Sequence, residues 1–428
     1  MKRFVVYRRT NKRALSVVLL LSLFVLSCTG STNGSVQKNR TAAEILGNPA
    51  FPAISYGGYR TNSREVQPTI TQIKADLQIL HAMGVRIVRT YNLQFEHSPN
   101  VVKAIAELRK EDPNFEMYVM LGTWIDCKDA WTEKPDHSQE SLANNSSEIE
   151  KAIALTNEYP EIIKIITVGN EAMVHWAWSY HVAPAVILKW VKHLQQLKKE
   201  GQLPKNLWIT SSDNFASWGG GDASYHTEDL TKLMAAVDYI SVHTYPFHDT
   251  HHNPSFWKEA PGNNLTTKEE RIDFSMEQAT NYAKMQYAQV KTHMQSLGID
   301  KPIHIGETGW SSNAINLFDK NGSRAADEYK QALYYNKMHA WAKENKITCF
   351  YFSAFDEPWK DPNGLDASEN NFGLFTVDGK AKFALWPLVD QGVFKGLRRE
   401  ENGAEIGKTF NGELSTLLNQ THQPNYTP

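Results

Sequence analysis

Two glutamates in this chain of 428 residues stand in similar sequence settings. Glu171 follows a Gly-Asn pair in the stretch VGNEAMVHWAW, and Glu307 follows a glycine in IGETGW. Each ends a short apolar run and is followed within a few residues by tryptophan. Glycoside hydrolysis needs two carboxyl groups, one to protonate the leaving oxygen and one to attack the anomeric carbon or to activate water. Together the two settings favour sugar chemistry over a pair of structural carboxylates.

Eight short apolar runs predict the scaffold that must hold these glutamates. The runs begin near residues 53, 85, 115, 162, 206, 237, 301 and 348. Amphipathic stretches that predict helices lie between them, at residues 69–84, 186–201, 268–297 and 325–346. Strands that are apolar throughout and alternate with helices are typical of a parallel sheet covered by helices. We therefore expect an α/β fold, a single (β/α)8 TIM barrel with enlarged βα loops.

A doubly wound open sheet is the competing architecture. It often carries a glycine-rich phosphate-binding motif after its first strand, and the sequence near residue 53 has none. The barrel is the better interpretation.

The carboxyl ends of barrel strands carry the catalytic groups of such folds. Polar and aromatic residues gather at these positions: Arg89, Tyr91, Asn92, Trp124, Asp126, Asn170, Glu171, Asp213, Asn214, His243, Tyr245, Phe247, Glu307, Trp310, Asp356, Glu357 and Trp359. Because Glu171 ends the fourth strand and Glu307 the seventh, we expect their side chains to face each other across the mouth of the barrel.

The stretches VGNEA, IGETGWSS and FYFSAFDEPWK together resemble glycoside hydrolase family 17, the β-1,3-glucanases. The resemblance extends over about residues 54–386. It implies a retaining hydrolase of β-1,3-glucan that works by double displacement, with Glu171 as acid/base and Glu307 as nucleophile. It also implies that Asn170 binds the sugar 2-hydroxyl and that Tyr245 lies near the nucleophile.

The expected substrate-binding set includes further strand-end residues. The resemblance implies that Glu357 and Trp359 contact substrate, and their positions add Arg89, Tyr91, Trp124, Asp213, Asn214 and Trp310. Plant members of the family typically have proline where Ser311 stands here. Some relatives with the FDEPWK form transfer glucan, so a β-1,3-glucan transglycosylase is an alternative to the hydrolase.

No cofactor and no metal are expected. The stretch HTYPFHDTHH offers histidines and an aspartate, but its last three histidines fall on an expected loop, whereas zinc ligands are commonly spaced on a fixed element. We expect His243 to shape the sugar site instead. The acidic loops DKNGSRAADE and DPNGLDASEN do not follow the EF-hand spacing.

Two further functional classes are weighed against the enzyme. A lipid-anchored glycan-binding protein without catalysis could lack one of the glutamates, and both are present. A barrel lyase or aldolase would need a strand-end lysine or a phosphate-binding loop, and the sequence shows neither. The glycoside hydrolase remains the leading hypothesis.

The N-terminus predicts export. Six basic residues within 1–13 precede the apolar stretch ALSVVLLLSLFVLS, which fits a signal peptide and is short for a membrane span. The following VLSC resembles the bacterial lipobox, which implies removal of residues 1–27 and lipidation of Cys28. A plain signal peptide with an incidental cysteine is the alternative. We expect the bacterial cell envelope as the location, with the anchor in the outer membrane on its periplasmic or surface face.

The remaining expectations concern domains, partners and thiols. Residues 28–49 are expected to form a polar tether, 50–395 the catalytic barrel and 396–428 a polar C-terminal tail with at most a short helix. The formal net charge of −2 gives no reason to expect nucleic acid, so the expected partners are β-1,3-glucan and the membrane, bound by a monomer. Cys127 and Cys349 should lie at opposite ends of the barrel and stay unpaired, because a strand is ~17–20 Å long.

Overall fold

The computed structural model describes residues 39–262 and 264–426. The expected signal peptide, Cys28 and most of the expected tether lie outside the described residues. No helix within the described ranges is long and apolar enough to cross a membrane.

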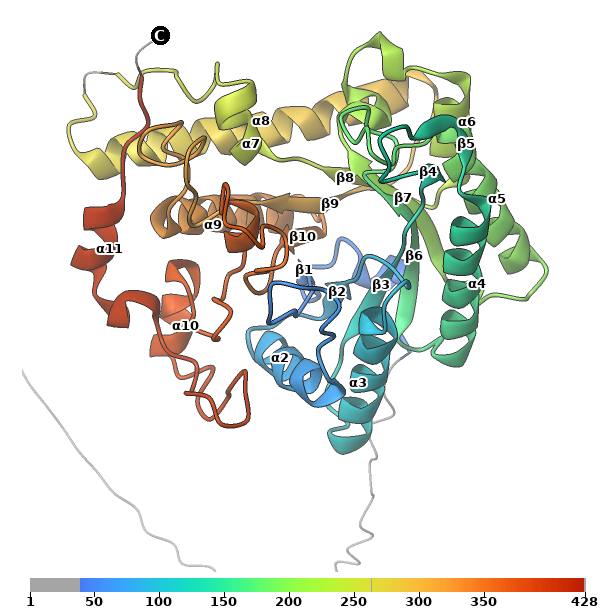
Figure 1. Cartoon of the computed structure of the whole chain (residues 1–428), viewed down its shortest axis with the longest axis horizontal. Coiled ribbons are helices and arrows are strands. Elements are labelled where there is room, and N and C mark those ends of the chain that lie inside the picture. The colour runs from blue at the N-terminus through green and yellow to red at the C-terminus, as the bar shows by residue number, and fades with distance from the viewer. Residues whose placement is uncertain (1–38, 263, 427–428) are drawn as a thin grey trace, which may run out of the picture. The chain divides into compact units, whose positions relative to one another are not determined.

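Eight parallel strands close into a barrel, in the order β1-β10-β9-β8-β7-β6-β3-β2 (Figure 1). Their bounds are β1 Ala53–Ser55, β2 Ile87–Arg89, β3 Tyr118–Thr123, β6 Ile163–Asn170, β7 Trp208–Asn214, β8 Ile240–His243, β9 Ile303–Gly309 and β10 Cys349–Phe352. Each of the eight apolar runs forms one strand. The predicted TIM barrel is confirmed, and the doubly wound alternative is excluded.

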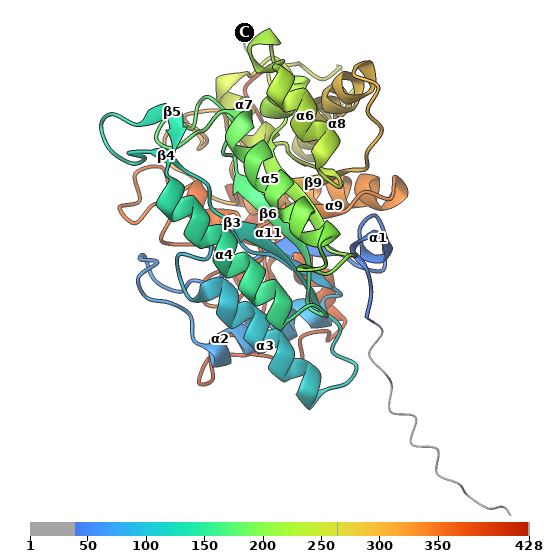
Figure 2. The same cartoon turned by 90° about the vertical axis from the view of Figure 1, so that its right-hand side faces the viewer.

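The barrel strands alternate with helices that cover the outside of the sheet (Figure 2). The main helices are α2 Ile70–Ala82, α3 His97–Glu111, α4 Leu142–Glu158, α5 Pro184–Lys199, α6 Glu228–Ala236, α8 Lys268–Ser296 and α9 Glu328–Glu344. Shorter helices are α1 Ala42–Ile45, α7 Pro246–His252, α10 Trp386–Asp390 and α11 Leu414–Gln420. Gly84 and Gly201 follow α2 and α5 with φ of 98° and 76°, the left-handed conformation that ends helices.

A hairpin of two short strands interrupts the regular alternation. β4 Cys127–Lys128 and β5 Asp136–Glu140 pair antiparallel between β3 and α4. Cys127 therefore lies beyond the carboxyl end of β3, whereas Cys349 opens β10. Both cysteines are free, as predicted.

The residues before the barrel correct the expected tether. Thr41 and Glu44 form a capping box that starts α1, and Ala42, Ile45 and Leu46 are buried. They belong to a core cluster that also contains Ile87, Tyr118, Met120, Ile165, Tyr239 and Phe350, from the barrel strands and their ends. Residues 42–46 thus belong to the folded domain, because their apolar side chains recur at helical spacing and find a buried partner.

The residues after the barrel correct the expected tail. Arg399 is fully buried, and its Nε lies 3.1 Å from Oδ1 of Asp76 on α2. Arg60 reaches the same carboxylate at 2.9 Å. Such a buried ion pair must be held in place, since leaving one charge unpaired is costly. The predicted short helix exists as α11, but the segment before it is an integral part of the fold.

Candidate active site

One cavity at the carboxyl ends of the strands contains both predicted catalytic glutamates. The side chains and backbone that line it belong to Gly57, Tyr59, Arg64, Tyr91, Asn92, Gln94, His97, Trp124, Trp131, Asn170, Glu171, Tyr180, Glu307, Phe352, Glu357, Trp359 and Lys360. The mouth of a TIM barrel is where catalytic loops converge. The cavity is rich in aromatic rings, which can stack on sugar rings.

Glu171 and Glu307 meet at a single imidazole. Nδ1 of His243 lies 3.1 Å from Oε1 of Glu171 and 3.8 Å from Oε2 of Glu307. The two carboxylate oxygens are therefore no farther apart than these two distances combined. The ~5–5.5 Å separation of retaining glycosidases falls within this limit. Of the ~6.5–9.5 Å range of inverting glycosidases, only the shortest separations do.

Glu307 is held as a carboxylate by three neighbours. Nη1 of Arg89 donates to its Oε1 at 2.6 Å, and the hydroxyl of Tyr245 donates to its Oε2 at 2.7 Å. Burial raises the pKa of Glu307, but the His243 imidazole, the Arg89 guanidinium and the Tyr245 hydroxyl outweigh it and lower the pKa to about 2. An unprotonated carboxylate at neutral pH is what a nucleophile requires.

Arg89 also orients Asn170. Its Nη2 donates to Oδ1 of Asn170 at 2.5 Å. Because a guanidinium can only donate, the amide oxygen of Asn170 is turned toward it, and the amide NH2 is left for an acceptor in the cavity. Arg89 itself is buried beneath Glu307 and Asn170 and is not part of the cavity wall. We expected it to bind substrate, and the structure places it as a support for two residues that line the cavity.

The backbone at Glu171 is strained. Its φ is 47°, in the left-handed region that residues other than glycine rarely adopt, and its N–H donates to the carbonyl oxygen of Ser212 at 2.9 Å. Gly169 has φ of 80°, and a Cβ there would lie 2.9 Å from Cβ of Ala172. The Gly-Asn-Glu sequence thus forms a tight turn that only glycine permits at its first position.

The Nε2 side of His243 is held by Ser212, which in turn contacts Ser241. Its Nε2 lies 2.7 Å from Oγ of Ser212 and 3.4 Å from Nη1 of Arg89. Oγ of Ser241 lies 2.9 Å from Oγ of Ser212. Because both neighbours of Nε2 can donate, this nitrogen suits the role of acceptor, and the ring proton is left on Nδ1, facing Glu171. His243 thus lies between Glu171 and Glu307, where it can shape the site.

Glu357, Trp359 and Tyr91 line the cavity as predicted. The guanidinium of Arg64 lies 4.3 Å from the ring centroid of Trp359, and the ring of Tyr59 meets the same indole edge-on at 5.9 Å. Burial raises the pKa of Glu357, and the charge of Lys360 opposes part of this rise. Lys360 was not predicted, although it is the last letter of the stretch FDEPWK.

Three residues that were predicted to bind substrate do not line the described cavity, and their side chains bond within the protein. Asp213 is fully buried and accepts from the N–H of Met173 at 2.8 Å, and burial raises its pKa to about 6. The indole N–H of Trp310 donates to the carbonyl oxygen of Ala325 at 2.8 Å. Oδ1 of Asn214 accepts from the N–H of Ala216 at 3.0 Å. None of Asp213, Asn214 and Trp310 is among the residues that line the described cavity.

Trp124 lies in the cavity as predicted, but two aromatic neighbours were missed. The ring of Tyr180 lies 5.0 Å from that of Trp124 and 4.9 Å from that of Trp131. Both residues stand on loops well beyond the ends of the barrel strands β3 and β6, so their sequence positions gave no indication that they line the cavity.

The histidine-rich stretch does not form a metal centre within the described part of the chain. No group of three or more His, Cys, Asp or Glu side chains there could hold a metal ion. Nε2 of His248 instead lies 3.0 Å from Oε1 of Glu369.

A family model described as the BtgE/BtgC glycoside hydrolase domain matches residues 53–373 of the chain. Among curated proteins, a glucan 1,3-beta-glucosidase of Arthroderma benhamiae is 24% identical over 272 residues, which are 62% of this chain and 70% of that protein. The Aspergillus clavatus protein described as "probable glucan endo-1,3-beta-glucosidase btgC" is 23% identical over 83% of this chain. The match spans 46% of the Aspergillus protein, so this chain corresponds to about half of it.

Two solved structures are similar. The crystal structure of an endo-laminarinase from Formosa Hel1_33_131 is 58% identical with a TM-score of 0.88, and the match covers 90% of this chain and 98% of that one. A glycoside hydrolase family 17 beta-1,3-glucanosyltransferase from Rhizomucor miehei is 21% identical with a TM-score of 0.53, over 78% of this chain and 96% of that one. At that identity the second likeness supports the fold alone.

Proposed function

Because the chain belongs to the BtgE/BtgC glycoside hydrolase family, we propose that it is an endo-acting hydrolase of β-1,3-glucan, of glycoside hydrolase family 17, that works with retention of configuration. The proposal for the substrate is supported by the 58% identity to an endo-laminarinase and by the curated glucan 1,3-beta-glucosidases. The observation that carries the mechanism is the placement of Glu171 and Glu307 on either side of Nδ1 of His243.

In the first step, the carboxylate of Glu307 attacks the anomeric carbon of the glucosyl unit at the scissile bond. The bond to the leaving oxygen breaks, and Glu171 donates its proton to that oxygen, so that a glucosyl ester forms on Glu307 and the reducing-end fragment departs. The positive charge of Arg89 and the hydroxyl of Tyr245 hold the nucleophile unprotonated before the attack. The NH2 group of Asn170 is positioned to donate to the 2-hydroxyl, a contact that strengthens in the transition state of such enzymes.

In the second step, Glu171 acts as a base. It removes a proton from water, the water oxygen attacks the same anomeric carbon, and the ester bond to Glu307 breaks. The product has the original β configuration, and both glutamates return to their starting protonation states. When the hydroxyl of a second glucan chain replaces water, the same chemistry transfers the glucosyl fragment.

The test is to incubate the purified protein with linear and branched β-1,3-glucans and to follow product sizes over time. Endo hydrolysis gives an early fall in mean chain length with a ladder of oligosaccharides. Release of single units from chain ends contradicts endo action, and products longer than the substrate identify transfer. Binding without any cleavage contradicts the enzymatic proposal.

We further propose that the protein is exported and anchored in the bacterial cell envelope through a lipid on Cys28. The support is the basic and apolar N-terminal sequence that ends in VLSC. A tether between the anchor and the barrel would then begin at residue 28 and end by residue 41, where the capping box of α1 starts.

A further inference from the structure

Trp131 is a large aromatic side chain in the cavity that the mechanism above does not use. It is 62% exposed, yet it lines the same cavity as Glu171 and Glu307. We propose that Trp131 is a binding platform for the glucosyl units on the leaving-group side of the scissile bond. The inference rests on the proposed function, because it names where part of that substrate binds.

The backbone of Trp131 is held in an unfavourable conformation. Its φ is 65°, and that of Asp129 is 55°. A bulky side chain in the left-handed region is uncommon, and such strain persists where the surroundings fix it, often at functional sites. Here the N–H of Trp131 donates to the carbonyl oxygen of Ser179 at 2.8 Å, which joins the hairpin loop to the loop after β6. Burial of the indole does not explain this strain, since most of the side chain faces solvent.

Trp131 is the outer member of a continuous aromatic surface. Its ring lies 4.9 Å from that of Tyr180 with an interplanar angle of 22°, and Tyr180 lies 5.0 Å from Trp124. The indole N–H of Trp124 donates to the buried carboxylate of Asp126, and hydrogen bonding from Trp131 acts on the same carboxylate. Both indoles are therefore held in place before any ligand arrives, which lowers the entropic cost of binding.

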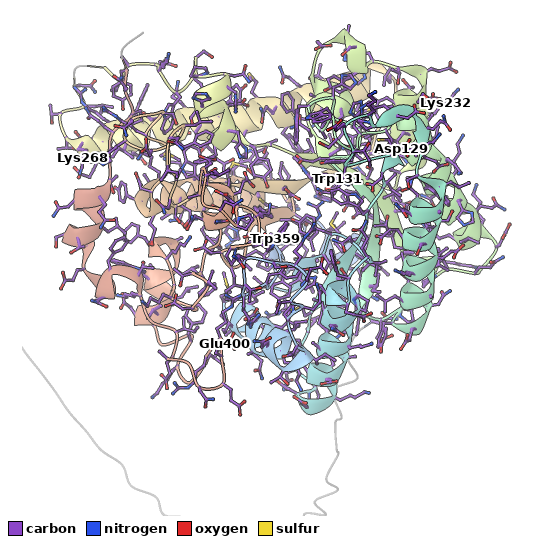
Figure 3. All side chains as sticks on the ribbon, viewed as in Figure 1. Asp129, Trp131, Lys232, Lys268, Trp359 and Glu400 are labelled. Carbon is purple, nitrogen blue, oxygen red and sulfur yellow. The ribbon has the colours of Figure 1, made fainter. Side chains whose placement is uncertain are left out.

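The positions of these rings in the barrel assign them to the leaving-group side. They come from the loops after β3 and β6, and Glu171, the proposed proton donor, directly follows β6. Trp359 instead comes from the loop after β10, beside β9, which carries Glu307 (Figure 3). The fragment that stays on the nucleophile extends toward Trp359, whereas the fragment that receives the proton extends past Glu171 toward Trp131.

The chemistry of the surface fits a neutral glucan. A β-linked glucosyl ring presents C–H groups on its faces, and these pack on aromatic rings, while its hydroxyls remain free to bind water or polar side chains. An exposed ring at the rim gains this contact only when the substrate extends beyond the units next to the scissile bond. Trp131 should therefore favour long chains over short ones and should retain acceptor chains for transfer.

The experiment compares Trp131→Ala with Trp178→Ala on two substrates. Trp178 is a matched control, because it is 58% exposed and stands on the loop joined to Trp131, but it is not among the residues that line the cavity. Laminarihexaose places glucosyl units on both sides of the scissile bond. β-Laminaritriosyl fluoride has a single atom as its leaving group and so places no sugar on the proposed platform.

We expect Trp131→Ala to lower kcat/KM on laminarihexaose by about tenfold, the effect of losing one good ring contact. The same variant should act on the fluoride within twofold of the unchanged protein, Trp131→Phe should regain most of the loss, and Trp178→Ala should change neither substrate. Equal losses on both substrates, or no loss on laminarihexaose, would contradict the proposal that Trp131 is a binding platform. A protein without any activity on β-1,3-glucans contradicts the proposed function instead.

Discussion

Gly57 and Glu357 approach each other so closely that a Cβ atom on residue 57 would lie 1.7 Å from Oε1 of Glu357. Gly57 follows β1 and Glu357 follows β10, two strands that are neighbours in the barrel. Both residues line the catalytic cavity. The missing side chain at residue 57 therefore provides the space for the buried carboxylate of Glu357 at the wall of the cavity.

Gly57→Ala should lower kcat/KM on β-1,3-glucan by up to about 10²-fold, because a shift of about 1 Å in a positioned group can cost that much. Gly407→Ala is the control, since a Cβ there would meet only the carbonyl oxygen of Glu405 at 3.9 Å. Steady-state kinetics and thermal unfolding of both variants test this. Unchanged kinetics in Gly57→Ala would show that the position of Glu357 is not critical.

The strained backbone at Glu171 predicts an inverted order of stability among variants. In most positions alanine is more stable than glycine, but with φ of 47° the order should reverse, so that Glu171→Gly unfolds at a higher temperature than Glu171→Ala. The difference should be about 1 kcal/mol, the cost of the left-handed conformation for a residue with a Cβ atom. Calorimetry of the two variants measures it.

The same two substitutions at Lys192, an exposed position inside α5, provide the control. There alanine should be the more stable. If the two sites show the same order, the strain at Glu171 is absent in solution.

Glu148 on α4 predicts a dependence of stability on pH. Its carboxylate accepts from the N–H groups of Leu93 and Trp124, and burial raises its pKa from 4.5 to about 7 despite these bonds. The pKa of Glu148 is higher in the folded than in the unfolded protein. Its contribution to the free energy of unfolding is therefore complete below pH 4.5 and is lost as the pH rises through about 7. The loss is on the order of 1–3 kcal/mol.

Glu148→Gln removes this ionisation and also removes one acceptor for a backbone N–H. The variant should be less stable than the unchanged protein at pH 5, and the difference in melting temperature should shrink by a few degrees by pH 8. Asp213, whose pKa burial raises to about 6, does not act on Glu148, so its titration is common to both proteins and cancels in the comparison. A difference that is constant between pH 5 and pH 8 would contradict the raised pKa.

The strands and the meeting of Glu171 and Glu307 in one cavity could be predicted from the sequence because both depend on local pattern. Each apolar run formed a barrel strand, and a glutamate at the end of such a run must lie at the mouth. Side-chain direction at the strand ends is less predictable. Register shifts between Thr167 and Asn170 and between Val242 and His243 change which residues point inward. Asp213 and Trp310 stand at or next to strand ends as Glu307 does, but both are buried and bond within the protein.

Long-range burial was the second source of error. Arg399 and Asp76 are 323 positions apart, and no local pattern near either residue indicates the pair. The same holds for α1, whose apolar residues are few and acquire a partner only when the barrel closes. Contacts between loops are equally hard to predict. Trp131 and Tyr180 become neighbours through a backbone hydrogen bond between their two loops.

The proposed anchor predicts that Cys28→Ala releases the protein from membranes. The lipid is attached through the sulfur, so alanine cannot carry it, whereas the barrel and its active site are unaffected. Fractionation of cells that express each form, followed by an activity assay of the soluble and membrane fractions, measures the change. Equal membrane retention of both forms would contradict lipidation at this residue.

The nucleophile is tested by Glu307→Gln. The amide cannot form the glucosyl ester, so activity should fall by several orders of magnitude. Binding of laminari-oligosaccharides should survive, because the aromatic rings and Asn170 are unchanged. Tryptophan fluorescence titrations measure the binding. A variant that retains more than a few per cent of the activity would show that another group attacks the anomeric carbon.

The proton donor is tested by Glu171→Gln, and the two tests together establish the stereochemistry. The variant should act poorly on glucan but well on substrates whose leaving group needs no proton, since Glu307 can still form the ester. Azide should then restore turnover, because a small anion attacks the ester without a base, and the product should be a β-glucosyl azide. Proton NMR of this azide and of the first sugar released by the unchanged protein gives the configuration. An α product from the unchanged protein would mean inversion, and Glu307 would then activate water instead of forming the ester.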